Sequence, residues 1–600
     1  MILEIRLSNF FSVMDEVVLD MQAANIQTKK AKALAGNTFK HKGVRLLKTA
    51  AIYGANASGK SNIIKAIRAC VSMIYNSHNH NENTVFPFTP FKFDGSDKPS
   101  TFFIRFIMDG VEYEYSFSMT TSEIIKEELH YTPNGRRATV FTRDESKGPV
   151  KKNIYDCKSG IRRPMDVAAN TSRKTLFISR ASQMGRELAQ KVFRYFNEQF
   201  VLYFANYTTD MVERLLEENR EQLLNVLRIA DSDIININSR SEQRSYTTAI
   251  FDPQNNNNIV SMDNIQKPQL VITTYHRNNP SVSFDFDEES EGTRRLFFMM
   301  LTIIDIVKNN KILLVDEIEM SLHTKLVEYI LTLFNNSECA QLIYTTHNTY
   351  LLNDNKIRKD QVYFTNKRAD GSTDLYSLYD YKDFREGMDI EKAYLQGRFD
   401  AIPYIDDTVS AIVKERIMAR YNRTSKEKRM RPNFFVFCEG ETEVAYVTHL
   451  RSKYRLPIQI IPKKSDSNIS CRYINNCKKE YVTTDRDRTF LMYDLDVAGI
   501  LEHLKCIPEA TLLVSNPCIE LWFLLHCTDC SAELNQNSCV KKYQAFSEYY
   551  TKGKLNVKDY LILAEGEDRA IDRAKRLTSP RNPSTTVYKL IEALKESHNE

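Results

Sequence analysis

The sequence has little net charge and no long hydrophobic run. Its 82 lysines and arginines exceed its 77 aspartates and glutamates by only five, which excludes a protein that binds polyanions over its whole surface. No segment reaches the roughly 18 uninterrupted apolar residues that a membrane-spanning helix needs. The opening sequence MILEIRLSNFFSV also lacks the basic and apolar regions of a secretory signal. We therefore expect a soluble, cytoplasmic protein with no membrane partner.

The eleven cysteines follow no regular framework, and a cytosolic chain would keep them as thiols. Cys527 and Cys530 form a C-x-x-C pair that could hold zinc, but no second such pair accompanies it. Two interpretations of this pair stay open, a zinc site and buried thiols at the end of a helix.

The composition is otherwise that of an ordinary globular protein, with 42% hydrophobic and 26% charged residues. A length of 600 residues allows roughly four domain-sized units. Strand patterns dominate the first part of the chain, where Asp109-Gly110 between two alternating runs predicts a hairpin. Apolar residues three and four apart then predict a helical insertion at about 180–250, and residues 253–267 predict a polar surface loop.

A basic stretch divides the chain. Residues 411–431 hold eight basic and two acidic side chains, a net charge of +6, so that the rest of the chain carries about −1. The stretch is either a solvated linker or a nucleic-acid contact, and both interpretations stay open. We predict an ATPase domain at 1–400, a basic helical linker at 401–431 and a second α/β domain at 432–600.

Residues 54–61, GANASGKS, match the phosphate-binding pattern G-x-x-x-x-G-K-[ST] between an apolar strand and an amphipathic helix. The glycines let backbone N–H groups surround the phosphates, Lys60 places a positive charge beside the β- and γ-phosphates, and Ser61 ligates Mg²⁺. This is a specific signal for ATP. The residues predicted to bind ATP through this loop are Gly54, Asn56, Gly59, Lys60, Ser61 and Asn62.

Three further motifs fit a nucleotide site. The apolar strand ILLV ends in Asp316 and Glu317, which would hold Mg²⁺ and orient the attacking water respectively. The strand QLIYT leads to His347, which alone would more often be a core histidine. Ser290 and Gly292 open a helix whose N-terminus could hold a second phosphate group.

The order of these motifs resembles the ATP-binding-cassette (ABC) type of ATPase, in the branch with the chromosome-maintenance (SMC) and RecF-like proteins. A Ser321-Leu322-His323 turn and the early NFFSV segment are also similar to that branch. The resemblance implies a homodimer or higher homo-oligomer through the ATPase domains, with ATP held between two copies. Ser290 and Gly292 of one copy would then face the phosphate loop of the other.

The same resemblance implies roles for two residues, Glu317 as the base that polarises water and His347 as a contact of the γ-phosphate. The serine-glutamate-glycine signature departs from the common serine-glycine-glycine form. Slow, switch-like hydrolysis and rapid turnover therefore both stay open.

Acidic residues follow two apolar strands of the C-terminal region. FFVFC ends in a segment with Glu439 and Glu443, and TFLMY ends in Asp494 and Asp496. At a strand end the chain bends, so both acids of a pair can reach one cation. Carboxylate oxygens suit Mg²⁺ or Mn²⁺, and we predict a metal site formed by these four residues.

This layout resembles a Toprim domain, and the later Ser515-Asn516-Pro517, Glu520-Leu521-Trp522 and His526 segments make it similar to RloB-type Toprim proteins. The resemblance implies Mg²⁺-dependent phosphodiester chemistry, with Glu439 as general acid/base or metal ligand. An ABC-type ATPase followed by a Toprim domain resembles the overcoming-lysogenisation-defect (OLD) nucleases and related bacterial anti-phage systems, some of them retron-associated.

The expected function is an ATP-gated, metal-dependent nuclease acting on DNA or tRNA. A retron reverse transcriptase with its msDNA, or another defence-system chain, is a further candidate partner. Two alternatives remain: an ATP-dependent sensor or scaffold with a non-cleaving Toprim domain, and a RecF-like DNA repair ATPase.

Overall fold

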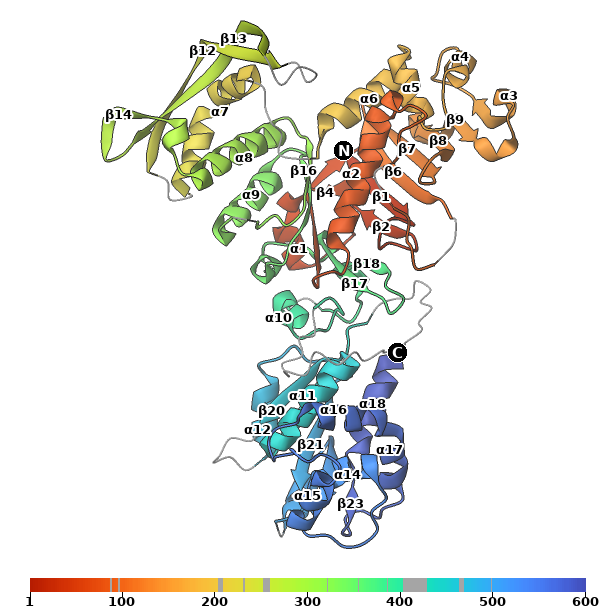
Figure 1. Cartoon of the computed structure of the whole chain (residues 1–600), viewed down its shortest axis with the longest axis vertical. Helices are drawn as coiled ribbons and strands as arrows, with labels where there is room; N and C mark the ends of the chain where they lie inside the picture. Colours follow the sequence, from red (N-terminus) through yellow and green to blue (C-terminus); the bar gives the residue numbers. More distant parts are fainter. Residues whose placement is uncertain are drawn as a thin grey trace. The chain divides into compact units, whose positions relative to one another are not determined.

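The structure is a computed structural model of the 600-residue chain (Figure 1). It describes all residues except 87–88, 95–97, 203–208, 230–232, 252–258, 321, 354, 386, 403–428, 463–468, 498 and 600. The described residues form two compact units. The first comprises Met1–Tyr53, Gly59–Leu351 and Asn355–Ser377, and the second comprises Gly54–Ser58, Leu352–Asp354 and Leu378–Glu600.

The first unit is built on a six-stranded sheet in the order β11-β15-β16-β5-β17-β18. Its strands are β5 (Thr49–Gly54), β11 (Phe200–Val201), β15 (Ile312–Val315), β16 (Gln341–Thr345), β17 (Val362–Lys367) and β18 (Thr373–Ser377). Strands β11, β15, β16 and β5 run parallel. The sequences TAAIYG and ILLV are buried along their whole length, as expected for parallel strands covered on both faces.

A seven-stranded antiparallel sheet stands beside it, in the order β10-β9-β8-β7-β6-β1-β2. Its strands are β1 (Ile2–Ser8), β2 (Val17–Asp20), β6 (Ser100–Met108), β7 (Val111–Met119), β8 (Ile124–Thr132), β9 (Ala138–Asp144) and β10 (Tyr155–Cys157). The predicted Asp109-Gly110 hairpin is confirmed, because both residues have positive φ, 51° and 70°, between β6 and β7. A two-stranded sheet joins β3 (Thr38–His41) to β4 (Val44–Leu47).

Helices cover these sheets, and α2 lies along them in Figure 1. The helices of this part are α1 (Lys29–Ala33), α2 (Lys60–Asn76), α3 (Lys151–Ile154), α4 (Pro164–Ala169), α5 (Phe177–Gln183), α6 (Glu187–Gln199) and α9 (Thr324–Asn336). One apolar core contains side chains of β1, β5, β6, α2 and α6. The nucleotide loop therefore leaves a buried strand and enters a buried helix.

The predicted insertion at about 180–250 is helical only in its first part. Helix α7 (Thr209–Ile229) confirms the helical spacing, but β12 (Ile234–Phe251) follows and pairs with β13 (Ile259–His276), which pairs with β14 (Asn279–Asp285). β12 reads IININSRSEQRSYTTAIF, whose alternating and β-branched residues suit a strand. Helix α7 packs on β12 and on α8 (Glu291–Lys308). The predicted loop at 253–267 is likewise wrong from Ile259, where β13 begins.

The second unit is built on a five-stranded sheet in the order β20-β19-β21-β22-β23. Its strands are β19 (Phe434–Cys438), β20 (Ile458–Pro462), β21 (Arg488–Asp494), β22 (Ala510–Asn516) and β23 (Ser584–Thr585). All pairs are parallel except β22 with β23. The chain passes from β19 to β20 on one side and then to β21 on the other, so the strand order reverses beside β19. Ligands of open α/β sheets bind at such a reversal, outside the carboxyl ends of the strands.

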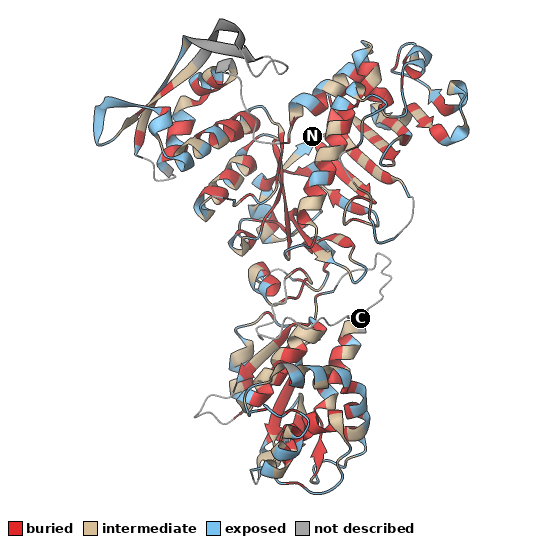
Figure 2. Cartoon of the chain, in the orientation of Figure 1, coloured by how far each residue is buried: buried red, intermediate tan, exposed pale blue. Residues whose placement is uncertain are grey.

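Helices cover both faces of this sheet, and the central strands β19 and β21 are largely buried (Figure 2). One face packs on α11 (Glu441–Tyr454), α14 (Glu520–Cys527), α15 (Gln536–Gln544), α16 (Val557–Glu565), α17 (Glu567–Lys575) and α18 (Tyr588–Asn599). The other packs on α12 (Cys471–Lys478) and α13 (Ile500–Lys505).

The second unit also includes α10 (Ile390–Leu395) and the residues around it. The buried Arg398 guanidinium donates to the Thr484 hydroxyl (2.9 Å) and to Asp487 Oδ1 (3.1 Å). The second unit takes up the whole chain from Leu378 onward, in addition to the two short segments named above. Most of the predicted basic linker, residues 403–428, lies outside the described residues.

Candidate functional sites

The phosphate loop connects β5 to α2, as predicted. Gly59 lies directly before α2 with φ +104°, a conformation that side-chain-bearing residues rarely adopt. A Cβ atom on Gly59 would overlap the Thr373 hydroxyl. This glycine is therefore required both for its backbone conformation and for the close approach of β18.

Two predicted nucleotide contacts differ in their surroundings. Asn56 is exposed, whereas Asn62 Nδ2 donates to Ser12 Oγ (2.7 Å). Ser12 Oγ also lies 2.7 Å from Thr373 Oγ1, and the Thr373 N–H donates to the Ser12 carbonyl (2.6 Å). In this structure Asn62 thus ties the start of α2 to the NFFSV turn. Ser61, the residue before Asn62, instead contacts Asp316 at the end of β15.

Ser61 Oγ donates to Asp316 Oδ1 at 3.1 Å. Thr345 Oγ1 donates to the same oxygen (2.7 Å) and accepts from the Glu317 N–H (2.7 Å). The hydroxyl and carboxylate predicted to share Mg²⁺ are therefore adjacent, and this pair of oxygen donors fits that ion. Thr345 was missed by sequence reasoning, although its place at the end of a buried strand next to His347 was a usable signal.

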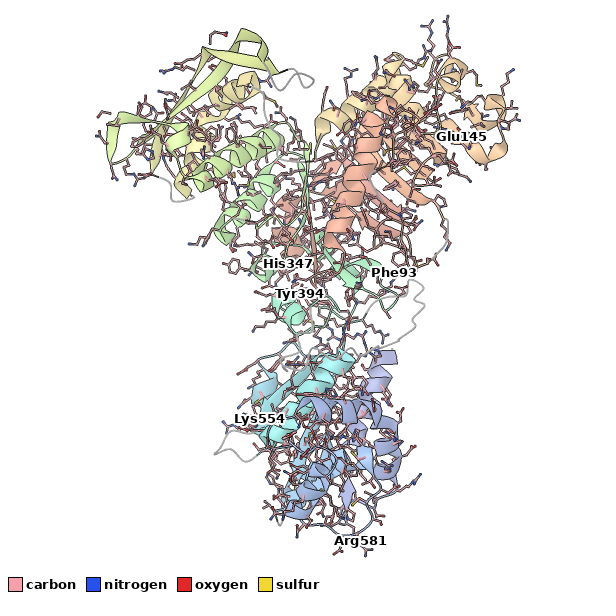
Figure 3. All side chains as sticks on the ribbon, viewed as in Figure 1. Phe93, Glu145, His347, Tyr394, Lys554 and Arg581 are labelled. Carbon is pink, nitrogen blue, oxygen red and sulfur yellow. The ribbon has the colours of Figure 1, made fainter. Side chains whose placement is uncertain are left out.

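Lys60 is buried among carboxylates. Burial lowers the pKa of its ammonium from 10.5 to about 8, while the charges of Glu317, Asp316 and Glu319 act in the opposite direction. Burial and the Lys60 charge lower the pKa of His347, whose position is labelled in Figure 3. The structure thus brings Lys60, Asp316, Glu317 and His347 within electrostatic reach of one another, together with Glu319, which sequence reasoning missed.

Ser290 caps helix α8 by accepting a hydrogen bond from the Thr293 N–H (3.1 Å). Gly292 lies in the first turn of the same helix. The predicted helix start is therefore confirmed. Ser321, in the predicted turn before α9, lies outside the described residues.

The acidic residues of the second unit gather at the carboxyl edge of its sheet. Glu439 follows β19 directly, and its Oε2 accepts from the Asp494 N–H (3.0 Å) at the end of β21. Glu443 lies in the first turn of α11 and is only 4% exposed. The strand-order reversal thus brings together three of the four predicted acids.

Glu520 joins this cluster and was missed as a site residue. Its side chain is fully buried at the start of α14. Oε1 accepts from the Tyr550 hydroxyl (2.8 Å), while Oε2 has no hydrogen-bond partner among the residues that the structure describes. Its position soon after the carboxyl end of β22 was the usable signal. A buried carboxylate oxygen without a partner is costly unless a cation or proton reaches it.

Burial and like charges dominate this cluster. Burial, together with the charges of Glu443, Glu520 and Glu439, raises the pKa of Asp494 from 3.8 to about 9, against a smaller opposite effect of Lys552. Burial also raises the pKa of Glu443 to about 6. Without a cation the cluster therefore holds protons that exposed acids would release.

The predicted fourth ligand, Asp496, is exposed. In the described ranges, no group of three or more His, Cys, Asp or Glu side chains is arranged to hold a metal ion. The site is thus not preformed, although its donor chemistry, its repulsion and the orphan Glu520 oxygen fit a divalent cation. Cys527 and Cys530 are free, partly buried thiols at the end of α14.

Residues 50–353 match the family model described as "AAA domain, putative AbiEii toxin, Type IV TA system". The chain belongs to this AAA-domain family. Residues 434–594 match a second model, described as "RloB-like protein". The predicted fold class is confirmed: an α/β P-loop ATPase domain is followed by a C-terminal α/β domain that is RloB-like.

The AAA-domain chain is also similar to solved SMC head structures. One, described as "SmcHead bound to the C-winged helix domain of ScpA", is 16% identical over 66% of this chain and 99% of that chain, with a TM-score of 0.28. The SMC head domain from Thermotoga maritima is 13% identical over 63% and 98%, with a TM-score of 0.29. The Pyrococcus furiosus SMC head with an extended coiled coil is 16% identical over 63% and 96%, with a TM-score of 0.29.

A search of curated proteins finds no match. Among the helices that the structure describes, each is too short or too polar to cross a membrane.

Gly59→Ala should weaken ATP binding by at least about tenfold, because the new methyl group overlaps Thr373 and the backbone cannot keep φ at +104°. Titration with a fluorescent ATP analogue measures the change. Gly43→Ala is the matched control, since Gly43 also has positive φ but has no atom near its Cβ position. Equal affinity in the Gly59 variant and the parent would contradict the assigned loop geometry.

Asp494→Asn should stabilise the metal-free protein, and the gain should grow with pH. A carboxyl whose pKa is higher in the folded than in the unfolded chain makes the folded state bind more protons, so the parent loses stability as pH rises from 3.8 toward about 9. The amide cannot titrate. Thermal unfolding at pH 5 and pH 8 should show a gain at pH 8 of about 2–4 °C for each kcal/mol relieved.

Mg²⁺ or Mn²⁺ should raise the unfolding temperature of the parent and of Asp496→Asn, but should give Asp494→Asn a smaller rise. ATP is left out so that the first unit does not contribute. A rise in Asp494→Asn as large as in the parent would place the cation elsewhere.

Proposed function

We propose that the chain is an ATP-gated, divalent-metal-dependent nuclease that cleaves DNA or RNA in anti-phage defence. The observation that carries this proposal is the cluster of Glu439, Glu443, Asp494 and Glu520 at the carboxyl edge of a parallel sheet. Buried acids that repel one another are unfavourable for folding. A cluster that raises the pKa of two of its members is typical of a functional site rather than a structural one.

The residues divide the chemistry among them. Glu443, Asp494 and Glu520 supply the oxygen donors for Mg²⁺ or Mn²⁺. Glu520 Oε2 can bind the cation without breaking a hydrogen bond to any described residue. Glu439, held by the Asp494 N–H, is a further ligand or the general acid/base. When bound, divalent ions stabilise the attacking and leaving oxygens of a phosphodiester displacement. Asp496 is left outside this set because it is exposed.

The ATPase domain supplies the control. Lys60 neutralises the β- and γ-phosphates, Ser61 and Asp316 hold Mg²⁺, Glu317 orients the attacking water and His347 contacts the γ-phosphate. In the ABC-type arrangement, Ser290 and Gly292 of a second copy complete the site, so the active form is a homodimer or higher homo-oligomer.

Contacts within the second unit support a route from nucleotide to nuclease site. The loop residues Gly54–Ser58 group with this unit, and the Gly54 backbone hydrogen-bonds to Tyr394 of α10. Tyr394 also donates to the Ala401 carbonyl (3.2 Å), and its position is labelled in Figure 3. A conformational change of the phosphate loop would therefore displace α10.

The route continues from α10 through Arg398. Arg398 is fully buried and donates to Asp487, whose Oδ1 accepts from the Asn433 N–H (2.9 Å). Asn433 immediately precedes β19, and β19 leads to Glu439. Two rigid elements joined by buried charge-assisted bonds can transmit such a shift.

The family descriptions support the place in defence. The matched AAA model is described as a toxin of a toxin–antitoxin system, and the second model as RloB-like. A toxin that is paired with an antitoxin agrees with a nuclease that is held inactive until it is triggered. A retron reverse transcriptase with its msDNA, or another defence chain, is the partner class that would hold it.

Purified protein with Mg²⁺ or Mn²⁺ should cut plasmid, single-stranded DNA or total tRNA, and Asp494→Asn should lower the rate at least about a hundredfold. Glu317→Gln should lower ATP hydrolysis by a similar factor while keeping ATP binding. Gel and fluorescence assays on the three substrates read both activities. Intact phage resistance with Asp494→Asn would instead favour a sensor or scaffold, and ATPase stimulation by DNA ends without cutting would favour a RecF-like repair ATPase.

Tyr394→Phe should uncouple the two activities, because it keeps the ring and removes the hydroxyl that bonds to Gly54 and Ala401. ATP hydrolysis and cleavage at saturating metal should persist, while the effect of ATP on the cleavage rate should fall severalfold. Tyr379→Phe is a matched control at an exposed tyrosine of the same unit. An ATP effect of parental size in Tyr394→Phe would show that the route lies elsewhere.

A further inference from the structure

The loop between α15 and α16, residues 545–556, borders the acidic cluster and has no role in the function proposed so far. Three bonds fix it there. The Tyr550 hydroxyl donates to Glu520 (2.8 Å), the Gly553 N–H donates to Thr442 Oγ1 (2.9 Å), and Gln544 Nε2 donates to the Tyr550 carbonyl (3.0 Å). Gly553 has φ +83°, and a Cβ atom there would lie 2.8 Å from Glu441 Oε2. The loop is therefore held closely against the start of α11.

Neighbouring aromatic residues of this loop differ widely in exposure. Tyr550 is 1% exposed and packs edge-on against Tyr543, with ring centroids 4.9 Å apart. Tyr549, the residue before it, is 81% exposed, and Phe546 is 39% exposed. Consecutive Cα atoms are about 3.8 Å apart, so the exposed Tyr549 ring stands beside a residue whose hydroxyl reaches the acidic cluster. Its backbone is already ordered, which lowers the entropic cost of binding.

The loop together with the adjoining ends of α15 and α16 is basic. Residues 541–558 hold five lysines and one acid, Glu548, for a net charge of +4. Lys552 and Lys554 are exposed, and Lys554 is labelled at the surface of the second unit in Figure 3. The Lys552 charge acts on Asp494, so this lysine lies within electrostatic reach of the acids. A positive rim of this kind offsets the repulsion that the carboxylates exert on a phosphate backbone.

We propose that this loop is the substrate platform of the acidic site and that its ligand is a single-stranded nucleic acid, with Tyr549 stacking on an unpaired base and Lys552 contacting the phosphate beside it. The inference rests on the proposed nuclease function of the same cluster. It adds the substrate class and two binding residues.

The choice of single strands follows from the exposed ring. In a duplex each base face is covered by its neighbours, whereas an unpaired base offers its face to an aromatic side chain. Stacking is tolerant of sequence because every base has such a face, and lysines beside it follow the backbone. Single-stranded DNA and the unpaired loops of an RNA share this chemistry, so the experiment tests both.

The test measures binding rather than cleavage, in full-length Asp494→Asn protein so that the ligand stays intact. Fluorescence anisotropy gives Kd for a labelled single-stranded DNA, an RNA of the same sequence and the matching DNA duplex. Tyr549→Ala should weaken binding of at least one single strand by about five- to a hundredfold, and Tyr549→Trp should restore it. Lys552→Gln should weaken binding and reduce the salt dependence by about one phosphate contact.

Controls separate a local effect from a folding defect. Tyr379→Ala removes another exposed tyrosine of the second unit, and Lys589→Gln removes an exposed lysine of α18, outside the basic segment. Both should bind as the parent does, and all variants should keep the parent's unfolding temperature and ATPase rate.

Three results would overturn the inference. If the parent binds single strands and Tyr549→Ala binds them within twofold of it, the platform is wrong while the nuclease proposal stands. If the variant loses duplex and single-strand binding equally, the single-strand specificity is wrong. If the parent binds no nucleic acid of any kind, both the inference and the proposed function fail.

Discussion

Both candidate sites depend on one constraint, that parallel strands bring their carboxyl ends to the same edge of a sheet. In the first unit, β5, β15 and β16 lead to the phosphate loop, to Asp316 and to Thr345. In the second, β19 and β21 lead to Glu439 and Asp494. Residues more than fifty positions apart in the sequence thereby come within hydrogen-bonding distance, as the Asp494 N–H and the Glu439 carboxylate do. Without parallel pairing these polar residues would be scattered over opposite ends of the molecule.

The carboxyl edges of the two sheets differ in their electrostatics. Lys60 is a buried cation surrounded by Asp316, Glu317 and Glu319, so its site already has compensating charges before a nucleotide binds. The second cluster has several carboxylates and little positive charge, apart from Lys552 in the loop nearby. It therefore favours cations, while the first site favours an anion that arrives with its own metal ion. The near-neutral total charge of the chain conceals this difference.

Sequence patterns predicted most of the fold where a local rule applies. The phosphate loop needs a buried strand, a glycine loop and a helix in direct succession, and Asp109-Gly110 needs only its two flanking strands. The helical spacing of α7 could also be predicted, because it is a local pattern of apolar residues. The strand β12 was not, because its polar, alternating sequence pairs with β13, a strand that follows it in the chain.

The candidate site was predicted in part for a similar reason. Glu439, Glu443 and Asp494 follow apolar strands or lie one helical turn beyond, so strand order alone brings them together. Glu520 and Thr345 act through packing: one is buried under Tyr550 and the other bonds to Asp316 across neighbouring strands. Asp496 shares a motif with Asp494 but turns to solvent. Such differences depend on side-chain direction at a strand end, which spacing does not encode.

The contact between Gly59 and Thr373 has a consequence for the order of events during synthesis. The phosphate loop is made early, and its neighbours Ser12 and Asn62 are made within the same short stretch. Thr373 contacts both Ser12 and Gly59, but it is synthesised more than three hundred residues later. The nucleotide loop thus reaches its final surroundings only when the ribosome has completed almost the whole first unit. A chain truncated before β18 carries the full phosphate-binding motif but lacks the strand that shapes it.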